Sequence, residues 1–191
     1  NGKADKTKIP GTSKVNFELT VKNTGNTVLR ELKCLDWDGK EFHTKESLQP
    51  GEEIKVTYTA EVKPDTDYEL LVQGKVDNSN QLIKSTWSAR LEKLNPQVEV
   101  QRTVSGDSLQ PGEPFVLNYV VRNTGNVDLI DVVIEESAFG EITRLDSIPA
   151  GKSAEFNKEL VLEQDTYSKT ILTARDAETE REYVYESAEM E

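Results

Sequence analysis

The segment Val21-Lys22-Asn23-Thr24-Gly25-Asn26 recurs as Val121-Arg122-Asn123-Thr124-Gly125-Asn126, at an offset of 100 residues. Two further landmarks keep the same offset without a gap, which indicates an internal repeat. These landmarks are Ser47-Leu48-Gln49-Pro50-Gly51 with Ser147-Ile148-Pro149-Ala150-Gly151, and Asp65-Thr66 with Asp165-Thr166.

The repeat predicts two domains, over residues 1–94 and 95–191. A length of 191 residues suits two domains of about 100 residues each. The boundary falls at Leu94-Asn95-Pro96-Gln97, a short linker that proline stiffens. The chain opens without Met or an apolar leader, so we expect a fragment of a larger protein.

Apolar and polar residues alternate on both sides of these landmarks. Val15, Phe17 and Leu19 are separated by polar residues, and Phe115, Leu117 and Tyr119 repeat that phase. A period of two with one apolar face indicates half-buried strands. The predicted strands cover 13–22, 28–36, 40–44, 53–63, 67–76 and 82–91, with an incomplete first strand over 3–8, and then 98–104, 114–122, 128–136, 140–145, 153–163, 167–175 and 181–189.

About seven short strands per unit, bounded by Gly, Pro, Asn and Asp, predict an all-β chain of two tandem immunoglobulin-like β-sandwiches. The Cys pair and Trp pattern of antibody domains is missing, so the strand topology within this class stays open.

Composition narrows the function classes. The net charge is -12, and all of it falls in residues 96–191, because residues 1–95 hold 15 basic and 15 acidic residues. An acidic surface repels phosphate backbones, which argues against nucleic-acid binding. No apolar run is long enough for a membrane helix, so we expect no membrane insertion. A single Cys and a single His rule out an intrachain disulfide and a Cys/His zinc cluster.

The two Asn-Thr-Gly-Asn motifs are interpreted as structural turns rather than ligand sites. Glycine at the third position allows a positive φ without strain. The Asn side chains can bond neighbouring backbone groups. The predicted turn residues are Asn23, Gly25 and Asn26, with Asn123, Gly125 and Asn126.

Two tryptophans are the candidate ligand contacts. Trp37 lies between two Asp residues ahead of Gly39, and Trp87 lies in the last strand of the first unit. Exposed aromatic rings could stack on sugars, although packing between modules is the favoured role of Trp37. Cys34, flanked by leucines, is expected to be a buried apolar residue rather than a nucleophile. His43 could approach it if their strands pair.

Acidic clusters are the remaining candidates. The turn Asp77-Asn78-Ser79-Asn80 lacks the Gly and the distal Glu of a calcium-binding loop. On a strand, Glu178, Glu180 and Glu182 would share one face, which does not converge on a cation. We therefore expect solvated surfaces, no metal site and no cofactor.

The strand ending in Asn-Thr-Gly-Asn, the following strand rich in Val, Ile and Leu, and the Pro-Gly or Ala-Gly before a long strand resemble the conserved repeats catalogued as domain of unknown function eleven. The cell-adhesion-related domains of bacteria are similar. The resemblance covers both units and implies tandem immunoglobulin-like modules of a secreted, cell-surface or wall-attached bacterial protein. Members often end the strand that follows Asn-Thr-Gly-Asn with an Asp, and at those positions this chain has Asp36 in one unit and Glu135-Glu136 in the other.

From these observations we expect a non-catalytic structural or interaction module, such as stalk or adhesin repeats. The alternative is a carbohydrate- or protein-binding module, accessory to a larger secreted enzyme. The expected partner is a surface or cell-wall protein or glycan, and the expected location is outside the cell. We expect the fragment itself to be monomeric. Neither the ligand nor the parent protein's other domains follow from the sequence.

Overall fold

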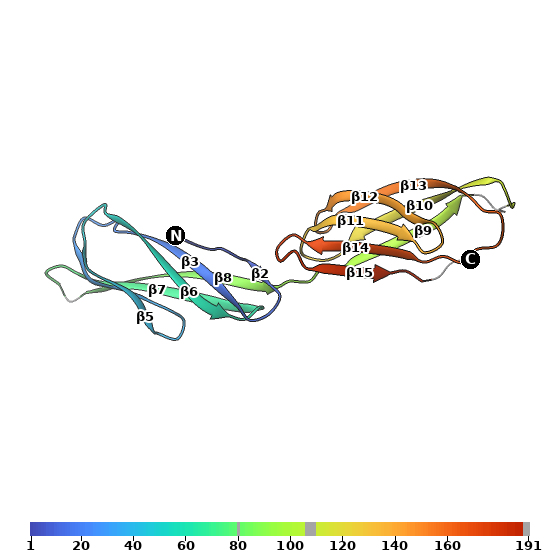
Figure 1. The fold of residues 1–191 in the computed structure, drawn as a ribbon. Helices are drawn as coiled ribbons and strands as arrows, with labels where there is room; N and C mark the ends of the chain where they lie inside the picture. The colour runs from blue at the N-terminus through green and yellow to red at the C-terminus, as the bar shows by residue number, and fades with distance from the viewer. Residues whose placement is uncertain (80, 106–109, 189–191) are drawn as a thin grey trace. The chain divides into compact units, whose positions relative to one another are not determined.

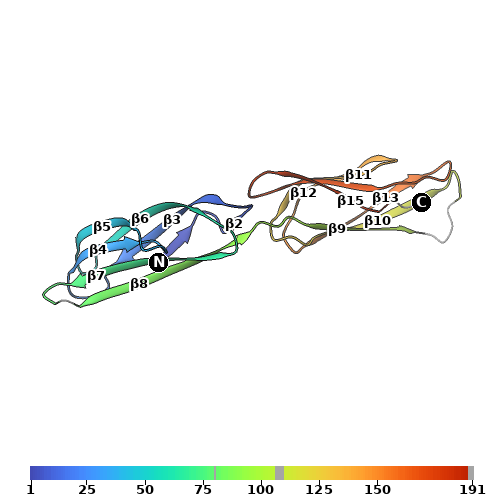
Figure 2. The same cartoon turned by 90° about the horizontal axis from the view of Figure 1, so that it is seen from below.

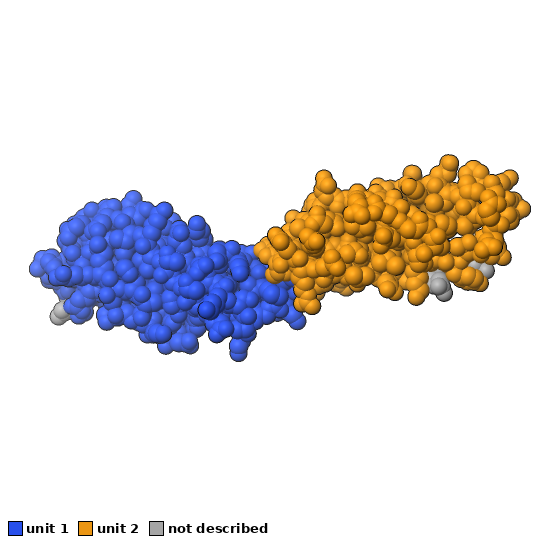
Figure 3. All heavy atoms as spheres, in the orientation of Figure 1, with its two compact units in different colours: residues 1–94 blue, residues 95–191 orange. Residues whose placement is uncertain are grey.

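The computed structural model describes residues 1–79, 81–105 and 110–188, and within them the chain consists of strands and turns with no helix. It divides into two compact units, Asn1–Leu94 and Asn95–Glu191 (Figure 3). Each unit is an immunoglobulin-like β-sandwich whose inward side chains alternate with outward polar ones.

Unit 1 has a three-stranded and a five-stranded sheet (Figure 1). The first sheet runs in the order β1 (Gly2–Ala4), β3 (Ser13–Lys22), β6 (Glu53–Val62). The second runs in the order β2 (Lys8–Ile9), β8 (Leu82–Lys93), β7 (Thr66–Val76), β4 (Leu29–Leu35), β5 (Glu41–Leu48).

Unit 2 has a three-stranded and a four-stranded sheet (Figure 2). The first runs in the order β13 (Ser153–Val161), β10 (Pro114–Asn123), β9 (Val98–Ser105). The second runs in the order β12 (Gly140–Ile148), β11 (Leu129–Glu136), β14 (Thr170–Asp176), β15 (Glu182–Glu186). The predicted strand 181–189 is shorter, and its last residue lies outside the described part of the chain.

The first strand of unit 1 differs from the single strand expected over 3–8. It is divided into β1, which pairs antiparallel with β3, and β2, which pairs parallel with β8. The polar residues 5–7 connect the two pieces, so the chain passes from one sheet to the other. The second piece, β2, thus lies beside β8, the last strand of unit 1.

Both units carry a β-bulge at the same repeat position. Glu31 and Asp131 have left-handed φ values of 51° and 50°, where β4 shifts register against β7 and β11 shifts against β14. Each acid reaches a base on the neighbouring strand, with 2.7 Å between Glu31 and Lys75 and 3.4 Å between Asp131 and Arg175. The repeat therefore extends to an irregularity that the alternation pattern does not reveal.

Candidate functional site

The asparagine that begins each Asn-Thr-Gly-Asn turn is buried and fully bonded. The Asn23 amide Nδ2 donates to the carbonyl oxygens of Thr27 and Leu48, both at 2.9 Å, and its Oδ1 accepts from Gly25 N–H at 3.0 Å. Leu48 is the last residue of β5, whereas Asn23 follows β3 of the other sheet. One side chain therefore joins the two sheets and the turn.

The second unit repeats this arrangement. Asn123 has no exposed surface, and its Nδ2 donates at 2.8 Å to the carbonyl oxygens of Val127 and Ile148. Its Oδ1 accepts from Gly125 N–H at 3.0 Å. Buried carbonyls that lose their donor are costly, so the amide at this position is required by the fold.

The glycines of the two turns do not adopt the positive φ that the sequence suggested. Left-handed glycines occur elsewhere, and Gly25 and Gly125 are not among them. At Gly125 the requirement is space, because a Cβ would lie 2.4 Å from the Asn95 carbonyl oxygen and 2.6 Å from Gln97 N. At Gly25 a Cβ would meet only the Asn23 Oδ1, at 3.3 Å.

The first residues of unit 2 cover its turn. Gln97 O accepts from Thr124 N–H at 2.9 Å and from Gly125 N–H at 3.0 Å. Asn126 donates its N–H to Asn95 O at 3.1 Å, and its Oδ1 accepts from Asn95 N–H at 2.8 Å. Asn126 therefore holds the segment that enters unit 2.

We predict that Asn123→Ala lowers the free energy of unfolding of unit 2 by about 2–4 kcal/mol, because two buried carbonyls lose their donor. Urea denaturation followed by circular dichroism measures this. The matched control is Asn157→Ala, an exposed position on β13 where we expect a change within about 0.5 kcal/mol. Equal losses for the two variants would contradict the assigned role.

The two tryptophans belong to an aromatic cluster inside unit 1. Trp37 lies with its ring centroid 4.4 Å from that of Tyr68 and 5.8 Å from that of Phe17. Trp87 lies 6.3 Å from Phe17 and is half-buried, as Trp37 is. These ring contacts of Trp37 and Trp87 lie within unit 1.

Two hydroxyl groups anchor this cluster to the backbone and to Asp36. Tyr68 OH accepts from Lys63 N–H at 2.6 Å and donates to Lys63 O at 3.2 Å, which is the tyrosine corner of immunoglobulin-like folds. Tyr58 OH donates to Asp36 Oδ2 at 2.6 Å. Burial, together with the adjacent Asp36 carboxylate, raises the pKa of Tyr58 to about 12.

Asp36 remains the charged partner of this pair. Its burial favours the neutral acid, but the hydrogen bonds from Tyr58 and from two backbone N–H groups outweigh that effect and lower its pKa. Those backbone donors, at 2.9–3.0 Å, belong to Asp38 and Lys40. The carboxylate thus closes the β4–β5 turn around Trp37.

Cys34 and His43 lie opposite each other in the β4–β5 pair, as their spacing allowed. Cys34 has no exposed surface, and burial raises its pKa to about 11. The thiol is therefore protonated at neutral pH and unsuited to nucleophilic attack.

We predict that Cys34 reacts with a thiol reagent at pH 8 only after unit 1 unfolds, because burial blocks access and raises the pKa of the thiol to about 11, which leaves very little thiolate at that pH. Between about pH 9 and 11 the unfolded chain loses the thiol proton while the folded chain retains it. The stability of unit 1 relative to Cys34→Ala therefore falls over that range. Rapid labelling of the native chain would contradict the buried placement.

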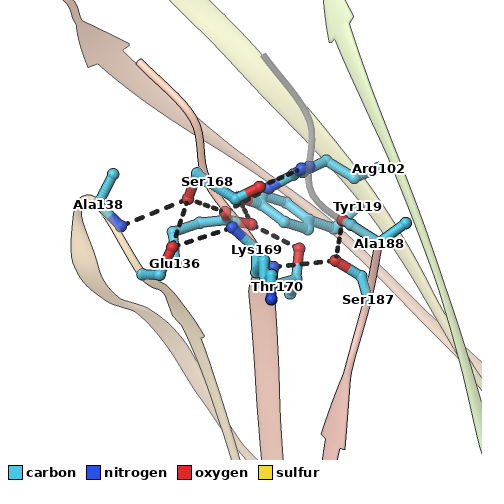
Figure 4. Close-up of polar contacts among 10 residues, drawn as sticks. Arg102, Tyr119, Glu136, Ala138, Ser168, Lys169, Thr170, Ser187 and Ala188 are labelled. Carbon is cyan, nitrogen blue, oxygen red and sulfur yellow. Dashed lines mark hydrogen bonds and ion pairs between the residues drawn. The ribbon is translucent and has the colours of Figure 1, made fainter.

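Unit 2 has a cluster of polar side chains around the buried Glu136 (Figure 4). Glu136 is 1% exposed and forms an ion pair with Arg102, which also donates to Ser168 O at 2.9 Å. The Glu136 carboxylate accepts from the hydroxyls of Ser168 and Thr170, both at 2.5 Å, and from Tyr119 OH at 3.1 Å. Burial and the Glu136 charge raise the pKa of Tyr119, so its hydroxyl stays a donor.

The repeat offset places different residues at the same positions in unit 1. The counterpart of Arg102 is Gly2, where a Cβ would lie 2.6 Å from the Trp87 ring. The counterparts of Tyr119, Ser168 and Thr170 are Leu19, Tyr68 and Leu70. Unit 1 thus fills with aromatic rings the region in which unit 2 holds its ion pair.

The sequence carries a signal for this ion pair, although neither residue was among the predicted site residues. Arg102 continues the inward phase of Val98 and Val100, and Glu136 continues that of Val132 and Ile134. Opposite charges in the inward phases of two strands indicate a buried pair.

We predict that Arg102→Met destabilises unit 2 by about 3–5 kcal/mol, because Glu136 is left buried without its cation. Adding Glu136→Gln, which keeps an acceptor for the hydroxyls, restores at least half of the loss. Arg122→Met, at an exposed arginine, is the control. If the double variant is no more stable than Arg102→Met, the charge is not the cause.

The acidic residues after β14 do not form the one-sided row expected on a strand. Glu178 and Glu180 lie in the turn between β14 and β15. The buried Asp176 carboxylate accepts from Glu178 N–H at 3.1 Å and from Thr179 N–H at 2.6 Å. Asp77, in the other candidate loop, pairs with Arg30 at 2.5 Å, and Asn80 lies outside the described residues.

Metal ligands do not gather in the described part of the chain, where the side chains form no group of three or more His, Cys, Asp or Glu that could hold an ion. Within residues 1–79, 81–105 and 110–188 no helix has the length and apolar character to cross a membrane.

Comparison with known proteins finds only distant structural likenesses. No family model and no curated protein matches the chain. It is similar to red sea bream transglutaminase, with 12% identity and a TM-score of 0.35 over 98% of this chain and 31% of that chain. It is also similar to the class 5 fimbriae chaperone CfaA, with 12% identity and a TM-score of 0.24 over 98% of this chain and 99% of that chain. Likeness at this level carries no argument about fold or function.

Proposed function

We propose that the chain is a non-catalytic structural and interaction module, with tandem immunoglobulin-like repeats that serve as a stalk or adhesin segment of a secreted or cell-surface bacterial protein. The observation that carries the proposal is the parallel pairing of β2 with β8 in unit 1. The surface location rests on the resemblance of the Asn-Thr-Gly-Asn repeats to bacterial surface modules.

Parallel pairing of β2 with the last strand, β8, gives unit 1 resistance to tension. A pull on the two ends of the unit draws β2 and β8 in opposite directions along their length. The backbone bonds from Glu92 N–H to Thr7 O and from Leu94 N–H to Ile9 O, both 2.9 Å, are then loaded together in shear. Bonds that must break together resist more force than bonds that open one at a time.

The distinctive side chains support the same interpretation. Trp37 and Trp87 pack on Phe17, the Cys34 thiol is buried, and Glu136 is bonded to four neighbouring side chains. Each contributes to holding its own sandwich together. A sugar-binding platform would need the tryptophan faces in solvent, so the carbohydrate-binding alternative draws less support.

Single-molecule stretching of the whole chain tests the proposal. We expect two unfolding events of about 30 nm each, from two units of some 95 extended residues. Glu92→Pro removes one loaded N–H donor and is expected to lower the unfolding force of unit 1 while that of unit 2 stays unchanged. Glu92→Ala keeps the N–H and serves as the matched control. Equal forces for the two variants would contradict a mechanical role of the β2–β8 pair.

A further inference from the structure

A groove lies beside the Asn-Thr-Gly-Asn turn of unit 1. It has a volume of about 510 Å³ and is lined by the turn together with Val21, Leu29, Val72 and Ile83. A second hollow of about 380 Å³ continues it along β3 to Asn1. Ile83 is 41% exposed, and Val21 and Leu29 are half-buried, so the groove presents apolar surface to solvent.

The same positions are covered in unit 2. Val121 and Leu129, the counterparts of Val21 and Leu29, have no exposed surface. The residues that cover this end are 95–100, which cross the turn and then pair with β10, with Val98 opposite Asn123 and Val100 opposite Val121. Both valines pack against the core of unit 2.

In unit 1 the corresponding edge of β3 is open. The β1 pairing reaches Leu19, and Asn1 exchanges two hydrogen bonds with Thr20, at 2.8 and 3.1 Å. Among the described residues no strand lies beside residues 21–23 on this side. Thr24 is an exposed residue, whereas its counterpart Thr124 donates its N–H to Gln97 O.

Gly25 is the observation that identifies the occupant. Within unit 1 the pressure for glycine there is mild, because its φ is not left-handed and a Cβ would make one tight contact, with Asn23 Oδ1 at 3.3 Å. In unit 2 the equivalent Gly125 is required by the backbone of residues 95–97, which passes within 2.4 Å of the Cβ position. If a polypeptide backbone crosses the turn of unit 1 in the same way, it explains the glycine at position 25.

We propose that this groove binds an extended polypeptide strand of the Asn-Pro-Xaa-Val-Glu-Val type, seated on unit 1 as residues 95–100 are seated on unit 2. The strand adds to the edge of β3 through backbone hydrogen bonds, as in β-strand addition. Its two valines cover Val21 and the apolar wall of the groove. Its acid faces Lys22, as Glu99 lies opposite Arg122 in unit 2.

Residues 95–100 of the same molecule are not the occupant, because they already cover unit 2 and pair with β10. The inference does not depend on a mechanical role for the module. The Asn-Thr-Gly-Asn turn of each unit is then a docking site for a strand. In unit 2 residues 95–100 already occupy that site.

The test fuses residues 94–100 directly before Asn1 of the whole chain, so that Val100 precedes Asn1 as it precedes Gln101. Both tryptophans lie in unit 1, so tryptophan fluorescence follows the melting of that unit alone. We expect the fusion to raise the Tm of unit 1 by on the order of 5 °C. A fused segment of the same composition in scrambled order is the control and should give no rise.

Gly25→Ala separates docking from a general effect of the extension. In the unextended chain we expect this variant to melt within about 2 °C of the parent, because the added methyl makes one tight contact, with Asn23 Oδ1 at 3.3 Å, which a shift of a few tenths of an ångström relieves. In the fused chain it should abolish the gain in Tm, because the methyl would lie where the docked backbone passes. Gly125→Ala is the matched variant and should lower the Tm of unit 2, followed by circular dichroism.

Three results would overturn the proposal. The first is no rise in Tm on fusion, and the second is a rise that Gly25→Ala leaves intact. The third is a dimer of the unextended chain in sedimentation that dissociates on fusion, which would make a second copy the occupant.

Discussion

The buried asparagine amide at the end of β3 and of β10 is the contact on which each sandwich depends. Asn23 and Asn123 use both amide hydrogens and the carbonyl oxygen to join one sheet, the turn, and the end of a strand in the other sheet. Two sheets held only by apolar packing could slide, because hydrophobic attraction has no direction. Hydrogen bonds of fixed geometry set where the sheets meet.

Because the asparagine fixes where the two sheets meet, the side chains inside each sandwich can differ. Unit 1 fills its centre with Phe17, Trp37, Tyr58, Tyr68 and Trp87, whereas unit 2 holds Arg102 and Glu136 among hydroxyl groups. A buried ion pair is seldom more stabilising than apolar packing, and losing one partner is costly. The two units are therefore expected to share a frame and to differ in how they tolerate substitution and pH.

Much of the fold could be predicted because the alternation of apolar residues reports which face of a strand is buried. The bounds of β3, β10 and β13 fall within two residues of those predicted. The asparagine turns were likewise expected to be structural. The division of the first strand into β1 and β2 could not be predicted, because residues 3–9 are too short and polar to show which sheet each piece joins.

The features that could not be predicted share one physical cause. The bulges at Glu31 and Asp131 need a left-handed φ, which is uncommon outside glycine, and the alternation of apolar residues does not mark them. The reason for Gly125 lies in the approach of residues 95–97, which are distant in sequence. Contacts between distant segments decide these positions, whereas periodicity reports only local burial.

Amide hydrogen exchange in the native chain tests most directly the claim that each turn is built to hold a strand and that one of them is filled. The N–H of Thr124 donates to Gln97 O, while Thr24 is an exposed residue. Under identical conditions the account predicts that Thr124 exchanges at least tenfold more slowly than Thr24. It also predicts that Gly25 and Gly125, both bonded to an asparagine Oδ1, are both protected. Equal exchange at Thr24 and Thr124 would contradict the account, because the two turns would then be covered, or uncovered, alike.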